Sequence, residues 1–473
     1  MAKRLKGLDA TFLYVETDAM PMHVALCAVL DPSTVPGGYS FEKMRAFIDS
    51  RVPLVKEFRR VVAEVPFRLD HPVWVDDPTY RVEHHVHRAR LDPPGDERQL
   101  ATFMAEMAER RLDRSRPLWE FWVVEGLEGG RIALTGKVHH CALDGGAAAD
   151  LMPAFFGIEP DPPPLEAVDT EPAPRPDDLE MLATAVVDRA RRLATGVGAV
   201  GQLGRSVRTV ATRRNETDGA GGTPLACPTT PFNGAITSRR AISFGRLSLP
   251  DVKAVGRAAG ATVNDVLLAT TAQAFRAYLT LVDALPDQPL LAAVPVSIRT
   301  EEQRGETGNR LSAMFVPLHT QLEDAAECLA ATVRDSEAAK REHAILGNDT
   351  LMRLSELLDP LVTPFGTELY SRAGLADRHR PIVNAIVSNV VGPPFPIYLG
   401  GARAERLYPM GPVIEGAGVN LTVMSYDGHI DVGLLAAAVL VPDPWVVTRR
   451  IPGALLRLAE AVGVPVGPEA PGA

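Results

Sequence analysis

Two adjacent histidines, followed at a short distance by an aspartate and a glycine, are the residues of this chain best suited to chemistry. They are His139, His140, Asp144 and Gly145, and they follow the apolar run 131–138. Successive side chains on a strand point to opposite faces, so a strand running through both histidines would let only one of them face a substrate. We expect one histidine to act as a base and the other to brace the strand end. The alternative is that both are packed core histidines and that Asp144 only caps the helix that follows.

The composition is that of a globular protein with a large core. The chain has 473 residues, of which 46% are hydrophobic and 23% charged, and its net charge is −10. The acidic balance argues against non-specific nucleic-acid binding. Its four cysteines are far apart and lack metal-ligand spacing, which is typical of reduced thiols in an intracellular protein.

Neither a secretory signal nor a transmembrane helix is expected. Acidic residues interrupt any apolar region near the start of the chain, and the clearest apolar run, 432–442, is far shorter than the ~20 residues that a spanning helix needs. We therefore expect a cytoplasmic protein whose contact with a membrane is at most peripheral.

Two loose stretches divide the chain. Residues 159–176 contain seven prolines, and residues 215–230 are rich in glycine and proline. The predicted parts are an N-terminal domain (1–158), a linker with a helical segment (159–230) and a C-terminal domain (231–473). Strands and helices are mixed in both domains without regular βαβ alternation, which predicts an α+β fold with two sandwich-like halves.

Periodicity places the individual elements. The expected strands are 22–30, 82–91, 121–125, 131–138, 290–297, 312–318, 385–391, 419–426 and 429–439, with a hairpin turn at Asp427-Gly428. The expected helices are 41–50, 99–111, 147–152, 249–259, 263–279, 323–342 and 446–462.

The segment Asp178 to Arg214 carries an apolar stripe at helical spacing, beginning with Leu182 and Val186. From Arg189 to Arg214 it has seven arginines and no acidic residue. A basic amphipathic helix of this kind can lie on an anionic lipid surface, or it can cover the domain junction with its arginines in water.

Three weaker signals are set aside. The G-x-G-x-x-G pattern at 196–201 follows an arginine-rich helical stretch and not a strand, so nucleotide binding is not expected there. His85 and His87 could share a strand face with Glu83 and hold zinc, but an ordinary histidine-rich strand fits as well, and we expect no metal. Cys141 would need an exposed, electropositive niche to act as a nucleophile.

The histidine stretch resembles the His-His-x-x-x-Asp-Gly motif of the acyl-CoA-dependent acyltransferase superfamily, which includes chloramphenicol acetyltransferase and peptide-synthetase condensation domains. Several other segments resemble those of the bacterial wax ester synthase/diacylglycerol acyltransferase family. These segments are Leu8–Leu13 with Pro21–Val24, Arg116–Trp119, Phe232–Gly234, Arg239–Arg240, Val263–Asp265, Pro295–Arg299, Gly308–Arg310 and Ser388–Pro393. The resemblance covers residues 5 to 462.

This resemblance implies two chloramphenicol-acetyltransferase-like domains with the active-site channel between them. It implies acyl-CoA as donor, no cofactor, and a diacylglycerol or a fatty alcohol as acceptor. It also makes His140 the general base and pairs Asp144, in a structural role, with an arginine of the other domain, for which Arg299 is the candidate.

Acyl transfer to a hydroxyl needs a proton acceptor and a donor for the oxyanion. A neutral histidine suits the first task. Backbone N–H groups at Gly145 could supply the second, and Asn264 is a side-chain alternative. Asn264 and Asp265 are candidate substrate-binding residues, and they could equally cap the helix that follows them.

The sequence therefore predicts a diacylglycerol O-acyltransferase of triacylglycerol biosynthesis that acts by direct transfer in a ternary complex. Wax ester synthesis from fatty alcohols is the near alternative. A non-catalytic protein that binds lipid or coats lipid bodies is the alternative from another class, and transfer from a carrier-protein thioester is a third.

Overall fold

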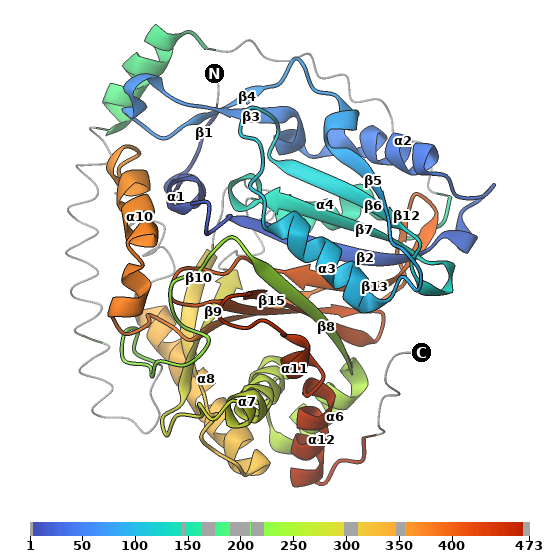
Figure 1. Ribbon diagram of the computed structural model, residues 1–473, viewed down its shortest axis with the longest axis vertical. Helices are drawn as coiled ribbons and strands as arrows, with labels where there is room; N and C mark the ends of the chain where they lie inside the picture. Colours follow the sequence, from blue (N-terminus) through green and yellow to red (C-terminus); the bar gives the residue numbers. More distant parts are fainter. Residues whose placement is uncertain are drawn as a thin grey trace.

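Two six-stranded sheets form the body of the computed structural model, one above the other in Figure 1. The structure describes residues 3–143, 147–161, 176–189, 209, 222–297, 311–346, 355, 356 and 358–466. The mixture of helices and sheets in two halves confirms the predicted α+β class.

The first sheet has the strand order β12-β13-β2-β7-β6-β5, with β5 and β6 parallel and the other pairs antiparallel. Its strands are β2 (His23–Asp31), β5 (Val86–Arg90), β6 (Trp119–Glu125), β7 (Ile132–His139), β12 (Tyr398–Leu399) and β13 (Ala402–Met410). Every residue of β7 is buried, so this strand runs through the core of the half. A small sheet of β1 (Lys3–Arg4), β4 (Val73–Asp76) and β3 (Arg60–Ala63) lies beside it.

The second sheet has the order β10-β9-β11-β14-β15-β8, and β11 is parallel to both of its neighbours. Its strands are β8 (Arg240–Ser248), β9 (Leu290–Ser297), β10 (Leu311–Leu318), β11 (Ala385–Val391), β14 (Val419–Tyr426) and β15 (His429–Ala437). The expected hairpin is confirmed, because Tyr426 pairs with His429 and both Asp427 and Gly428 adopt positive φ.

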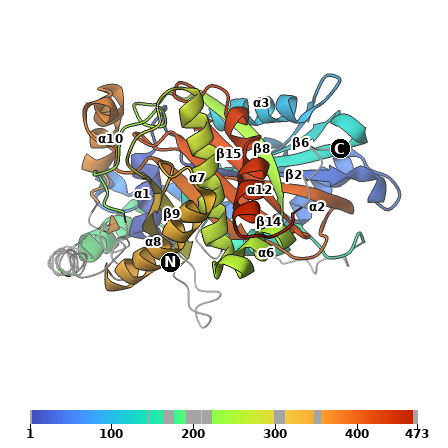
Figure 2. The same cartoon turned by 90° about the horizontal axis from the view of Figure 1, so that it is seen from below.

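Helices cover the outer face of the second sheet, as Figure 2 shows. They are α6 (Leu249–Ala259), α7 (Val263–Leu281), α8 (Ala325–Leu346), α11 (Trp445–Thr448) and α12 (Ile451–Ala461). The first half has α1 (Gly7–Val15), α2 (Phe41–Arg51), α3 (Glu97–Ala108) and α4 (Ala147–Phe155), and α10 (Val362–Arg372) packs against α1. None of the described helices is long and apolar enough to cross a membrane.

The two halves share a buried apolar interface built around α3. Leu100 and Met104 of α3 pack with Phe244 of β8 and Tyr408 of β13. The helix begins at a capping box, because Asp96 accepts from the Gln99 backbone N–H and the Gln99 side chain accepts from the Asp96 N–H.

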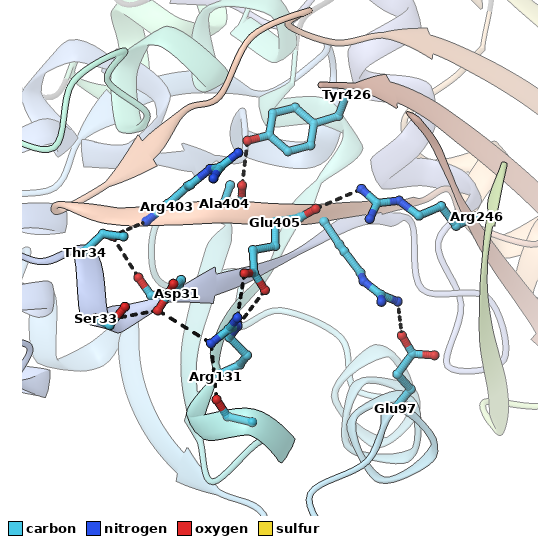
Figure 3. Close-up of polar contacts among 12 residues, drawn as sticks. Asp31, Ser33, Thr34, Glu97, Arg131, Arg246, Arg403, Ala404, Glu405 and Tyr426 are labelled. Atoms are coloured by element: carbon cyan, nitrogen blue, oxygen red, sulfur yellow. Dashed lines mark hydrogen bonds and ion pairs between the residues drawn. The ribbon is translucent and has the colours of Figure 1, made fainter. Parts of the chain in front are cut away.

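Strand β13 crosses the expected domain boundary. Although it lies within residues 231–473, it pairs with β2 in the sheet of the N-terminal half. Figure 3 shows the polar contacts of β13. Arg131 donates to the Glu405 carboxylate through Nε (2.7 Å) and Nη2 (2.8 Å), and Arg246 donates to the backbone carbonyl of Glu405. The hydroxyl of Tyr426 donates to the carbonyl of Ala404 (2.7 Å). A division at residue 231 therefore does not describe the sheets.

Several local expectations need correction. Residues 82–91 are not one strand, because a 3-10 turn (Val82–His84) precedes β5. The helix expected over 446–462 is broken into α11 and α12. The sequence did not predict α1, α10, β8 or β13.

The segment expected to be amphipathic is described only in part. Residues 178–189 are helical; Met181 packs with Ala63 of β3 and Val73 of β4, and Ala185 is buried, whereas Val186 of the predicted stripe is exposed. The buried face is therefore not the expected one. The rest of the segment, including the G-x-G-x-x-G pattern, lies outside the described residues apart from Thr209.

Candidate active site

The two histidines lie where strand β7 ends. His139 is its last residue and pairs across the sheet with His23, while His140 begins a 3-10 turn (His140–Ala142). The backbone N–H of His140 donates to the carbonyl of Met22 (2.8 Å) and fixes the point where the chain leaves the sheet. His139 is 1% exposed and His140 is partly exposed, so the two rings lie in different environments.

His139 is hydrogen-bonded at one ring nitrogen and faces a carboxylate with the other. Its Nδ1 accepts from the backbone N–H of Cys141 (3.2 Å), and its Nε2 lies 3.5 Å from Oε1 of Glu16. The hydrogen bond at Nδ1 and the carboxylate beside Nε2 fix the orientation of the ring, so His139 braces the strand end.

Glu16 ties this end of β7 to two other segments. Its Oε2 receives Nη2 of Arg114 (2.8 Å), and its Oε1 accepts from the backbone N–H of Met22 (3.2 Å). Burial alone would raise the pKa of this carboxyl, but the hydrogen bonds and charges of His139 and Arg114 outweigh it and lower the pKa to about 2. Glu16 is therefore ionised in the folded protein at neutral pH.

His140 stacks against the ring of Phe12. The ring centroids are 3.8 Å apart and the planes meet at 17°. Burial lowers the pKa of His140 to about 4, with a smaller contribution from His139, and these exceed the opposing effect of a backbone hydrogen bond. The ring is therefore neutral, and able to take up a proton, at physiological pH.

Helix α1 organises this site from the other side. Phe12 lies in the last turn of α1 and Glu16 is the residue that ends the helix, and they meet His140 and His139 respectively. Tyr14 bonds to Nδ1 of buried His71 (2.7 Å). Glu16 was not predicted as a site residue, although its four-residue spacing from the aromatic residue of the N-terminal signature was visible in the sequence.

A glycine fixes how α1 packs. The backbone N–H of Gly7 donates to Oε1 of Glu356 (2.7 Å), and a Cβ at residue 7 would lie 2.6 Å from the backbone N of Glu356. Only glycine permits this close approach.

Buried Lys137 holds helix α3 against β7. Its ammonium donates to the carbonyls of Met107 (3.0 Å) and Arg110 (2.7 Å) at the end of the helix and lies 3.2 Å from Glu120. A cation in this position donates hydrogen bonds to the last carbonyls of the helix and interacts favourably with the negative end of the helix dipole.

Asn264 and Asp265 lie in the first turn of α7. Thr262 is the N-cap, and Oδ2 of Asp265 accepts from the Thr262 N–H (3.0 Å) and hydroxyl (2.6 Å). Among the described residues, no hydrogen bond or ion pair joins either residue to His139 or His140. The capping alternative therefore describes Asp265, whereas Asn264 is partly exposed and free of that role.

Three of the remaining candidate residues lie outside the described residues: Asp144, Gly145 and Arg299. Cys141 is 2% exposed and burial raises its pKa well above the ordinary value, so it is not placed as a nucleophile. His85 is stacked between Tyr80 and Trp119 in the core, and the described part of the chain has no cluster of three metal-ligating side chains.

A pocket of about 490 Å³ lies at the opposite end of β7. Its lining includes Tyr39, Arg88, Glu125 and Arg131. The eight residues of β7 span roughly 24 Å at about 3.4 Å per step, so this pocket is remote from the histidines.

The family description "Wax ester synthase/diacylglycerol acyltransferase catalytic domain" matches residues 5–267, and "WS/DGAT C-terminal domain" matches residues 307–459. The chain belongs to the wax ester synthase/diacylglycerol acyltransferase family. It is an acyltransferase, as the histidine motif predicted.

Individual relatives agree with this assignment. A Mycobacterium tuberculosis H37Rv protein with the provisional name diacylglycerol O-acyltransferase is 36% identical over 469 residues, which cover 97% of this chain and 90% of that protein. The solved wax ester synthase/diacylglycerol acyltransferase of Marinobacter aquaeolei VT8 is 25% identical, with a TM-score of 0.68 and coverage of 98% and 100% of the two chains.

A more distant structure shares the fold alone. The starter condensation domain of rhizomide synthetase, solved with C8-CoA and Leu-SNAC, is 14% identical, with a TM-score of 0.55 and coverage of 98% and 95%. The predicted likeness to condensation domains is thereby confirmed at the level of the fold.

Proposed function

We propose that this family member transfers a long-chain acyl group from acyl-CoA to diacylglycerol, with His140 as the general base. The observation that carries the proposal is the difference in environment between the two histidine rings. His139 is 1% exposed at the end of β7, whereas His140 is partly exposed, stacked on Phe12 and neutral. Such a ring can accept the proton of an attacking hydroxyl.

The proposed reaction is a direct transfer in a ternary complex. The acceptor hydroxyl attacks the thioester carbonyl carbon as its proton passes to a ring nitrogen of His140. The tetrahedral oxyanion then collapses, the C–S bond breaks, and the thiolate of CoA takes the proton back from the imidazolium. Because a thiol of pKa about 8.5 is a good leaving group, no further acid and no acyl-enzyme are required.

The low pKa of His140 has two opposite effects on such a base. It keeps nearly all of the enzyme in the proton-accepting form at pH 7, but it weakens the thermodynamic drive for proton uptake. Phe12 supports the proposal because its stacked ring fixes the orientation of the imidazole.

The remaining parts of the expected site stay proposals. Gly145 would supply backbone N–H groups to the oxyanion, and Asn264, near the N-terminus of α7, is the side-chain alternative. Asp144 and Arg299 would form a structural ion pair across the channel between the halves. No metal or organic cofactor enters this reaction.

Two other functions are retained as outcomes of the test. Wax ester synthesis would use the same base on a fatty alcohol, and the family name of the Marinobacter relative includes both activities. A protein that only binds lipid or coats lipid bodies would not need a neutral histidine beside a braced one. Because the proposed acceptor is insoluble, we also propose peripheral contact with the inner face of the membrane or with lipid bodies.

The test is a matrix of donors and acceptors on the purified protein, read by release of free thiol from acyl-CoA. Diacylglycerol, a long-chain alcohol and no acceptor are compared, and an acyl carrier protein replaces CoA in a parallel set. His140→Ala should fold and lose activity to background, whereas His84→Ala, which changes an exposed histidine, should keep it. Wild-type activity in His140→Ala would exclude the proposed base, and a preference for the alcohol would make the protein a wax ester synthase.

A further inference from the structure

The backbone around the proposed base is held by hydrogen bonds on both sides. The N–H of His140 donates to the carbonyl of Met22 (2.8 Å). The N–H of the next residue, Cys141, donates to Nδ1 of His139 (3.2 Å). Met22 and the ring of His139 therefore set where the backbone of His140 lies, and with it the position from which its ring can meet a substrate.

The carboxylate of Glu16 contacts both of these supports. Its Oε1 accepts from the backbone N–H of Met22 (3.2 Å) and lies 3.5 Å from Nε2 of His139. Met22 bonds to Glu16 through its N–H and to His140 through its carbonyl, so one residue joins the carboxylate to the backbone of the base. A displacement of the carboxylate would therefore disturb the turn on both sides of His140.

Arg114 and the end of helix α1 hold this carboxylate in turn. Nη2 of Arg114 donates to Oε2 of Glu16 (2.8 Å) and to the carbonyl of Leu13 (2.9 Å) in the last turn of α1. The side chain of Glu16 is 1% exposed, and an ionised carboxylate at that depth needs a cationic partner. Phe12, from the same turn of α1, stacks on the ring of His140. The end of α1 therefore supports both the ring and the backbone of the proposed base.

A carboxylate can make these contacts and a neutral amide of the same size cannot. Glu16 presents one oxygen to Arg114 and the other to the N–H of Met22, and both of these groups are donors. Glutamine has one acceptor oxygen and one NH₂ group, which accepts nothing. Whichever way the amide is turned, one of the two donors loses its acceptor. Glu16→Gln therefore loosens the support with almost no change of volume.

We propose that Glu16 is a positioning residue for the acyl transfer, which holds His140 in place through Met22 and His139. This deepens the proposed function and rests on it, because the position of His140 affects the rate only if its ring takes the proton of the acceptor hydroxyl. With its side chain 1% exposed, Glu16 is not placed to touch either substrate. A displacement of a reacting group by ~1 Å can cost ~100-fold in rate.

The experiment compares the steady-state kinetics of wild type and Glu16→Gln with acyl-CoA and diacylglycerol dispersed in detergent. Rates are expressed per folded molecule, with folding measured by circular dichroism. Arg114→Gln is a second test variant, which removes the cation from the same carboxylate and carries the test if Glu16→Gln does not fold.

Tyr426→Phe is the matched control for a general loss of stability. It also removes a buried hydrogen bond, from its hydroxyl to the carbonyl of Ala404 (2.7 Å). Ala404 pairs with Leu30, and Leu30 pairs with Ile132, so this contact lies at the opposite end of β7 from the histidines.

We expect Glu16→Gln to lower kcat by about 10- to 100-fold and to change KM by less than about twofold. Arg114→Gln should lower kcat by about 3- to 10-fold, and Tyr426→Phe should keep the wild-type kcat. Wild-type kcat in folded Glu16→Gln, or in Arg114→Gln if the first variant does not fold, would overturn the proposal. An equal loss of kcat in Tyr426→Phe would also overturn it, as would a raised KM at unchanged kcat, which would indicate a role in substrate binding.

Amide hydrogen exchange tests the support of the turn without turnover. In Glu16→Gln the N–H groups of His140 and Cys141 should exchange at least about tenfold faster than in wild type, with no such change in Tyr426→Phe. Unchanged exchange in Glu16→Gln would overturn the proposal. A wild type that transfers no acyl group would overturn the proposed function, whereas an active wild type with unaltered kcat and exchange in Glu16→Gln would overturn only the role of Glu16.

Discussion

The depressed pKa of His140 leads to a quantitative expectation at acid pH. If His140 is the general base, kcat/KM with diacylglycerol follows the fraction of free enzyme in which this ring is neutral. Burial against Phe12 lowers the pKa of His140 to about 4, whereas an unperturbed histidine titrates near 6.5. The acid limb of the profile should therefore lie near the lower value.

The difference is large at an accessible pH. At about pH 5.5 a group of pKa 4 is roughly 97% neutral, and a group of pKa 6.5 is roughly 9% neutral. Wild type should therefore keep almost all of its kcat/KM between about pH 7.5 and 5.5, whereas an unperturbed base would lose about tenfold.

The assay measures thiol release with 4,4′-dithiodipyridine, which reacts with thiols in acid solution. Phe12→Ala gives the ring of His140 access to water and should move the acid limb upward by about one pH unit, towards the unperturbed value. Phe103→Ala removes an aromatic ring that packs on Trp122 instead, and it should leave the acid limb in place. Circular dichroism at each pH confirms that the protein remains folded.

An acid limb near pH 6.5 in the wild type would refute the reasoning, because it would show that His140 is well solvated or that another group is the base. An unchanged limb in Phe12→Ala would show that the stacked ring does not set the pKa. A profile that follows the loss of folded signal would report unfolding and not the base.

Three further results are expected. First, the free energy of unfolding should fall by about 2–3 kcal/mol between about pH 7.5 and 5. Burial lowers the pKa values of folded His23 and His140 to about 3 and 4, so the unfolded chain binds more protons over this interval. Burial raises the pKa of Asp431 to about 6, and this opposing effect offsets about 1 kcal/mol of the loss. Second, Glu16→Gln should lower the free energy of unfolding by about 1–3 kcal/mol in urea at neutral pH, because it removes the charge that holds a buried histidine and an arginine. Third, Tyr426→Phe should cost about 1–3 kcal/mol in the same assay, because it removes the hydroxyl that bonds to the buried backbone N–H of Ile397 and the carbonyl of Ala404 in β13.

Matched controls separate these effects from general damage. Asp18→Asn changes an exposed carboxylate paired with Arg111 and should cost less than about 0.5 kcal/mol. Tyr398→Phe removes a hydroxyl that makes no hydrogen bond with the described residues and should be nearly neutral. Stability that rises on acidification, or control variants as unstable as the test variants, would contradict the assigned contacts.

The helices and strands that could be predicted are those whose own sequence shows the periodic pattern of buried residues. Strands β9, β11 and β14 and helix α6 have the predicted bounds because each shows a clear apolar period or a cap. Strand β13 was missed because its sequence carries charges and a proline, and only pairing with β2 and the contact with Arg131 make it a strand. Helix α10 was missed because its apolar face is exposed and not packed into the core.

The candidate site was likewise predicted only in part. The sequence located the histidine pair and the strand that ends there, and it foresaw that the two rings would differ. It could not show the surroundings of either ring, because these depend on Glu16 and Phe12, which lie far away in the chain. It also left Asp265 as a substrate-binding or a capping residue, and the structure shows Oδ2 of Asp265 in a capping box with Thr262.

By itself, the sequence determined the class of fold, the family and the position of a histidine able to accept a proton, because strand alternation and motif spacing are local properties of a chain. Only the tertiary structure decided that His139 is tied to Glu16 and that His140 is stacked and neutral. The physical reason is that burial and the charge of neighbouring groups set the protonation of a side chain. Those neighbours are brought together only when helix α1 folds against the end of β7.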